Sequence, residues 1–225
     1  MTDPAGTFPD VARSLQNARA LHDETFTHMD VDEVLDALLD RVRAILRVDT
    51  AVVLLTDRQN RSLVATAARG IEEEVSQAVH VPVGAGFAGR VAAERRPVYI
   101  EDVADANIFN PLLVKRGLRS LLGVPLIADG TLVGVLHVGT TVPRRFTTDE
   151  TQFLELAAAR AALAVRYQLT RAERAGALEL QRSLVPAALP ELPGLEMAAR
   201  YRPGKASVGG DWYDVFPSLR ARSAS

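Results

Sequence analysis

The sequence predicts an α+β fold in which helices flank a largely antiparallel sheet of about six strands. Two pairs of strand-like segments are each joined by a short turn, and helical segments precede, separate and follow these pairs instead of alternating with single strands. Hydrophobic residues make up 48% of the 225 residues, which is enough for a substantial core. We therefore expect one main domain together with a piece of another.

The first elements are two helices and a hairpin. Apolar residues recur at three- and four-residue steps over residues 11–28, so we expect an N-terminal helix within residues 1–27 and the main domain from residue 28. Asp30 is the expected N-cap of a second helix with a wide apolar face. Residues 50–57 and 62–69 then predict two strands joined by a turn.

A glycine-rich segment follows a short helix and a short strand. Gly84-x-Gly86-x-x-Gly89 has the spacing of a dinucleotide-binding loop. However, Pro97 ends the following helix early, and the strand-helix-strand unit over residues 80–100 is shorter than the roughly 30 residues of a βαβ unit. We instead expect the first two glycines to supply turn conformations and the third to let the helix pack closely on the sheet.

The second half predicts a hairpin and a long helix. Two apolar runs within residues 119–139 flank Asp129-Gly130, a dipeptide typical of the type I′ turn because both positions need a positive φ. A helix should begin at Thr147 or Thr148, with acidic residues in its first turn, and continue to about residue 184.

Three segments carry a resemblance to a known family: "GAGFAGRVAAERRPVYIED", "RSLLGVPLIADGTLVGVLHVGT" and "RRFTTDETQFLELAAARAALAV". Together they resemble a GAF domain over residues 28–168, the small-molecule sensor module of signalling proteins. The resemblance implies a central antiparallel sheet with helices packed on one side and a loop-rich ligand pocket on the other.

The ligand of this pocket stays unknown. The chain has no cysteine, which excludes covalent bilin attachment and the cysteine-dependent methionine sulfoxide reductases among the relatives. Gly139-Thr140 stands where a cyclic-nucleotide GAF domain would have Asn-Lys, so we interpret Asp149 and Glu150 as helix-start acids. His137 lies in an apolar strand and is interpreted as a structural histidine instead of a haem ligand. A ligand-free dimerisation scaffold remains the alternative function.

The C-terminal stretch carries a second resemblance. "LQRSLVPAALPELPGLEMAARYRPGKASVGGDWYDVF" is similar to the start of SpoIIE-type serine/threonine phosphatases of the PPM family, so residues 185–225 are expected to be an incomplete phosphatase segment. The resemblance implies two Mn²⁺ or Mg²⁺ ions in the complete domain, with Asp211 as a metal carboxylate. It also implies a phosphoserine-bearing anti-anti-sigma-type regulator as partner. We expect no phosphatase activity from this chain, because one carboxylate cannot hold two metals.

Residues 169–184 are expected to form a signalling helix between the two parts. Leu156 and Leu163 begin a row of residues spaced by seven, but the row that should accompany it contains Arg166 and Glu173. A homodimer through the GAF domain and this helix is expected, and a solvated spacer is the alternative. Ligand binding would then act by biasing the orientation of the helix.

Charge and hydropathy exclude several classes of protein. The net charge is -2 without a basic stripe, so we expect no nucleic-acid partner. No apolar run reaches the roughly 18 residues of a membrane span, and the N-terminus has no signal-peptide pattern. We therefore expect a cytoplasmic protein without a membrane partner.

Overall fold

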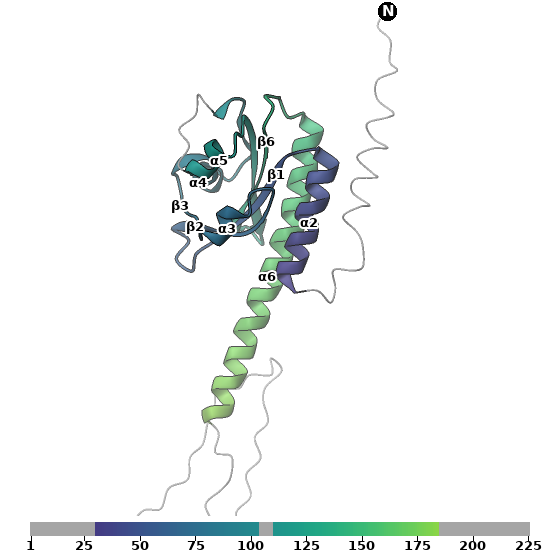
Figure 1. Cartoon of the computed structure of the whole chain (residues 1–225). Coiled ribbons are helices and arrows are strands. Elements are labelled where there is room, and N and C mark those ends of the chain that lie inside the picture. Colours follow the sequence, from purple (N-terminus) through teal and green to yellow (C-terminus); the bar gives the residue numbers. More distant parts are fainter. Residues whose placement is uncertain (1–29, 104–109, 185–225) are drawn as a thin grey trace, which may run out of the picture. The chain divides into compact units, whose positions relative to one another are not determined.

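The computed structural model describes residues 30–103 and 110–184 (Figure 1). The chain divides into two compact units, residues 1–167 and residues 168–225, and the whole sheet belongs to the first unit. The helix expected within residues 11–28 and the phosphatase-like residues 185–225 lie outside the described residues. No helix among those described is long and apolar enough to cross a membrane.

The sheet has six strands in the order β3-β2-β1-β6-β5-β4, and every neighbouring pair is antiparallel. This confirms the predicted α+β class with a central antiparallel sheet. The strands are β1 (Thr50–Thr56), β2 (Ser62–Arg69), β3 (His80–Pro82), β4 (Val98–Ile100), β5 (Ser120–Ala128) and β6 (Thr131–Thr140).

Two helices cover one face of the sheet. They are α2 (Val31–Leu46) and the first turns of α6 (Thr148–Leu184), and their apolar sides share one core with the strands (Figure 1). Asp30 caps α2 as predicted, because its Oδ1 accepts a hydrogen bond from the Val31 amide at 2.7 Å and the Glu33 carboxylate accepts one from the Asp30 amide at 3.3 Å.

The beginning of α6 also matches the prediction. The Thr147 hydroxyl accepts a hydrogen bond from the Glu150 amide at 3.2 Å, and the Glu150 carboxylate accepts one from the Thr147 amide at 2.8 Å. This reciprocal pair satisfies two amides at the helix end that would otherwise lack partners. Asp149 and Glu150 are therefore helix-start acids, as the sequence predicted.

Three short helices cover the opposite face. They are α3 (Glu73–Ser76), α4 (Gly86–Glu94) and α5 (Pro111–Lys115), and they form a second core with the other side of the strands (Figure 1). Strands β5 and β6 are consequently covered on both faces. Nearly all their residues are buried, which explains why their sequences read as continuous apolar runs instead of alternating ones.

The two hairpin turns are defined by local chemistry. Asp129 and Gly130 have φ of 50° and 74°, which confirms the predicted turn between β5 and β6. Between β1 and β2, the Asp57 carboxylate accepts hydrogen bonds from the Ser62 hydroxyl at 2.7 Å and from the Arg61 amide at 2.9 Å. These bonds lower the pKa of Asp57 below its usual value.

The glycine segment is not a dinucleotide loop. Strands β3 and β4, which flank α4, lie at opposite edges of an antiparallel sheet, whereas a βαβ unit needs parallel strands of one sheet joined by the helix. Gly84 and Gly86 have φ of 89° and 57°. A Cβ at Gly89 would lie 2.2 Å from the Pro82 carbonyl oxygen, so this glycine allows α4 to approach the preceding turn.

Candidate functional site

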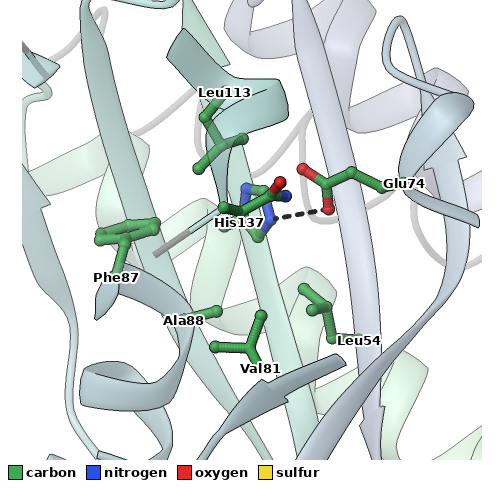
Figure 2. Close-up of a pocket in the computed structure, with 8 residues that line it drawn as sticks. Leu54, Glu74, Val81, Phe87, Ala88, Leu113 and His137 are labelled. Carbon is green, nitrogen blue, oxygen red and sulfur yellow. Dashed lines mark ion pairs between the residues drawn. The ribbon is translucent and has the colours of Figure 1, made fainter. Parts of the chain in front are cut away.

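A small cavity lies between the sheet and the three short helices (Figure 2). The space that a water-sized molecule can occupy is about 10 Å³, close to the minimum for one water molecule. Five of the lining side chains are apolar and three are polar. They are Leu54, Val81, Phe87, Ala88 and Leu113, and Glu74, Asn110 and His137.

Strand β6 positions His137 in this cavity. Its neighbours Leu136 and Val138 point into the core beneath α2 and α6, so the alternation of the strand directs the imidazole to the opposite face. His137 is 2% exposed, and its Nδ1 has no hydrogen-bond partner among the described residues. A buried imidazole nitrogen without a partner is unusual in a folded protein.

An aromatic contact holds the imidazole ring. Phe87 of α4 meets it edge to face, with ring centroids 5.8 Å apart and an interplanar angle of 80°. Gly123 of β5 lies opposite His137 in the sheet, and a Cβ there would be 2.9 Å from Phe87 Cζ. The missing side chain at position 123 therefore makes room for the phenyl ring beside the histidine.

Helix α3 supplies a carboxylate to the same cavity. Glu74 is completely buried, and neither of its carboxylate oxygens has a hydrogen-bond partner in the part of the chain that the structure describes. His137 Nε2 lies 3.8 Å from Glu74 Oε2, which is too long for a hydrogen bond (Figure 2). The imidazole and the carboxylate therefore face one another without a hydrogen bond between them.

Asn110 and Leu113 come from the start of α5. Asn110 is buried and caps the helix, since its Oδ1 accepts a hydrogen bond from the Leu112 amide at 3.0 Å. Leu113 of the first turn is 3% exposed and lines the cavity across from Val81 and Leu54 (Figure 2). The cap thus fixes an apolar wall of the site.

An open groove of about 280 Å³ lies near the start of α6. Its charged side chains pair with acids: Arg145 Nε lies 2.7 Å from the Glu101 carboxylate, and Arg144 pairs with Glu150. Arg144 also stacks over the Phe146 ring at 4.7 Å. Because these charges already have partners, the groove is a weaker candidate than the buried cavity.

Comparison with known proteins identifies the family. The model of the GAF domain matches residues 28–166. The chain belongs to the GAF domain family.

Solved structures agree with this assignment. The GAF domain of a phosphoenolpyruvate-protein phosphotransferase from Coxiella burnetii has a TM-score of 0.65 at 21% identity, over 72% of this chain and 98% of that one. Free methionine-R-sulfoxide reductase from Neisseria meningitidis, solved with its substrate, has a TM-score of 0.55 at 22% identity, over 75% and 95% of the two chains. At these identities the likeness shows the fold alone.

One curated relative matches a short stretch of the chain. The chain is 34% identical over 85 residues to the HTH-type transcriptional activator RamA of Corynebacterium glutamicum. The match covers 36% of this chain and 30% of that protein, so the chain spans less than a third of this relative.

The structure tests only some of the site residues that the sequence predicted. Asp211, the expected metal carboxylate, lies outside the described residues. Within residues 30–103 and 110–184, no group of three or more His, Asp or Glu side chains could hold a metal ion. His137 was interpreted as a structural histidine, but in this GAF domain it lines the cavity with an unpaired ring nitrogen.

Sequence reasoning missed Glu74. It stands in a run of three glutamates, which reads as a solvated helix start. The missed signal is periodicity: Glu74 and Val75 lie three and four residues after Ile71, which is fully buried, so Glu74 belongs to the apolar face of the helix. A carboxylate on the buried face of a short helix points to a polar site.

Proposed function

We propose that this GAF domain is the ligand-binding sensor of a cytoplasmic SpoIIE-type protein serine phosphatase, and that the cavity around His137 and Glu74 is its ligand site. The observation that carries the proposal is that the buried Glu74 carboxylate and His137 Nδ1 have no hydrogen-bond partner among the described residues. Folding leaves such groups unpaired at a cost of about 1–3 kcal/mol each. A ligand that completes their hydrogen bonds would recover this free energy on binding.

The phosphatase part of the proposal is supported by sequence alone. Residues 180–216 resemble the opening of the phosphatase domain, with Asp211 as a carboxylate for Mn²⁺ or Mg²⁺. The metal ions would activate the water that attacks phosphoserine on an anti-anti-sigma-type regulator.

The sensor role is tested by a thermal-shift screen of small metabolites on the full chain. Ala88→Leu places a larger side chain in the cavity, and Ala93→Leu adds the same group on the exposed side of α4 as a matched control. A true ligand should raise the melting temperature of the wild type and of Ala93→Leu in a saturable way, and it should fail to do so with Ala88→Leu.

The outcomes separate the sensor from the scaffold. Ligands whose effect is the same in Ala88→Leu would contradict the assignment of the cavity. A screen without any saturable ligand would favour the dimerisation scaffold. In a protein that carries the complete phosphatase domain, a cavity ligand should change the rate of phosphoserine hydrolysis, and Asp211→Ala should abolish hydrolysis without weakening ligand binding.

A further inference from the structure

The three consecutive glutamates of the α3 region have different environments. Glu72 Oε1 accepts a hydrogen bond from the Gly70 amide at 2.8 Å, and Glu73 is exposed. Glu74 is 0% exposed and has no such bond within the described ranges. Of these three glutamates, Glu72 stabilises the start of the helix, and the buried Glu74 carboxylate makes no hydrogen bond that would do so within the described residues.

The backbone fixes the direction of the Glu74 side chain. Its amide donates to the Ile71 carbonyl at 3.1 Å, and its own carbonyl accepts from the Val79 amide at 2.9 Å. Ile71 is buried in the core on this face of the sheet, with Val75 and Val79 packed against it. Because these contacts anchor α3 on both sides of residue 74, the carboxylate cannot turn out to solvent without moving the helix.

Three buried polar atoms of the cavity lining could each form a further hydrogen bond. They are Oε1 and Oε2 of Glu74 and Nδ1 of His137, and all lack a hydrogen bond within the described part of the chain. In its ionised form the Glu74 carboxylate only accepts hydrogen bonds, so a ligand that satisfies that form must donate them. A donor that is positively charged forms the stronger bond.

The charge of the lining selects the same kind of ligand. Among the described residues that line the cavity, the one acid faces no lysine or arginine, and five of the eight side chains are apolar. The basic group that faces Glu74 among the lining residues is His137, with its Nε2 3.8 Å from Oε2, so an anion would be repelled by the carboxylate while a cation would be attracted to it. The free space of about 10 Å³ holds one water molecule, so even a compact organic ligand enters only when the lining side chains move apart.

We propose that the cavity binds a small organic cation, an ammonium or amidinium group on a compact apolar body. The cationic N–H groups would donate to Glu74, and the apolar body would lie against Leu54, Phe87 and Leu113 (Figure 2). This inference rests on the proposed sensor function, because it names the ligand class of the same site.

Three probes of similar shape test the charge preference. Isopropylammonium, isopropanol and isobutyrate share the isopropyl group and differ in charge. They are titrated into the ¹⁵N-labelled full chain, and the amide shifts of residues 74 and 137 are followed by NMR. We expect isopropylammonium to bind at least ten times more tightly than the other two, with a millimolar dissociation constant.

Two matched variants test whether the preference for the cationic probe depends on the charge of Glu74. Glu74→Gln keeps the shape of the side chain and removes its charge, so it should reduce the affinity for isopropylammonium at least tenfold. Glu73→Gln makes the same change on the exposed neighbour and should leave the affinity unchanged. Should Glu74→Gln fail to fold, Glu74→Met removes the same charge with an apolar side chain of similar length.

Several results would overturn the inference: tighter or equal binding of isopropanol or isobutyrate, a preference that survives in both Glu74 variants, or no shift with isopropylammonium up to its solubility limit. These failures remain distinct from failure of the sensor function. If the metabolite screen yields a ligand that Ala88→Leu rejects, the cavity is a sensor site with another ligand chemistry.

Discussion

Replacing Glu74 by methionine should stabilise the protein. Methionine has a similar length and a helix propensity close to that of glutamate, so it can remain in α3 with its thioether in the cavity. The change removes two carboxylate oxygens that have no hydrogen-bond partner among the described residues. The site would thereby lose its polar acceptor and gain an apolar contact.

The expected gain is about 1–3 kcal/mol in the free energy of unfolding. An unsatisfied buried polar group costs about that much, and its removal recovers the cost. Little should be lost at His137, because the 3.8 Å between its Nε2 and Glu74 Oε2 is longer than a hydrogen bond. A volume-conserving replacement costs less than about 1.5 kcal/mol in packing, so a gain from the middle of this range, about 2 kcal/mol, leaves the variant about 0.5 kcal/mol or more above the wild type.

Guanidinium chloride unfolding, followed by circular dichroism of the full chain, measures this difference. Glu73→Met is the matched control, since it makes the same replacement at the exposed neighbour and should change the free energy by less than about 0.5 kcal/mol. The denaturant slope should stay constant in both variants, so that a shifted midpoint reports stability alone.

A neutral or destabilising Glu74→Met would refute the reasoning. It would mean that the carboxylate already has partners that stabilise the fold, so that a ligand would have nothing to complete. Stabilisation together with loss of cation binding would show the trade-off expected at a binding site, where function retains groups that folding disfavours.

Three other changes test the fold and the assembly. Gly123→Ala should lower the free energy of unfolding by about 1–3 kcal/mol in thermal melts, because its Cβ would lie 2.8 Å from Val91 and 2.9 Å from Phe87 of α4. Gly176→Ala is the control: the space around its Cβ is open, and the change should increase helicity. Leu163→Glu, at a side chain 59% exposed, should convert the expected dimer to monomers in sedimentation runs without changing the melting temperature. Asp57→Asn should destabilise the chain at neutral pH. Because the bond from Ser62 lowers the folded pKa, this difference should vanish as the pH falls below 3.8 and through that pKa.

Local sequence signals predicted most elements of the fold. The Asp30 and Thr147 caps and the Asp129-Gly130 turn each depend on contacts between residues a few positions apart, so their chemistry is readable from the sequence. The strand order could not be read in this way, because it depends on pairing between distant segments such as β1 and β6.

The cavity could not be predicted because its polar residues are far apart in the sequence. Glu74 and His137 are brought together only when α3 closes over the sheet, and each is inconspicuous alone. A histidine in an apolar strand is more often structural, and the interpretation of His137 as structural followed that general rule. For Glu74, the sequence signal was its position three residues after the buried Ile71, on the apolar face of α3.

The position of His137 also suggests how ligand binding in the cavity could affect α6. Along β6, His137 faces the cavity, while Leu136 and Val138 on either side pack in the core that contains Phe153, Leu154 and other residues of α6. A ligand that displaces β6 at residue 137 must therefore disturb contacts that hold the first turns of α6. Such a disturbance transmits a signal only if the ligand prefers one of two arrangements of the strand.

Hydrogen exchange should then change at α6 amides between residues 153 and 165 when isopropylammonium is added to the wild type, and it should not change in Glu74→Gln. Changes in hydrogen exchange confined to α3 and α4 would mean that the cavity binds the ligand without any effect on α6.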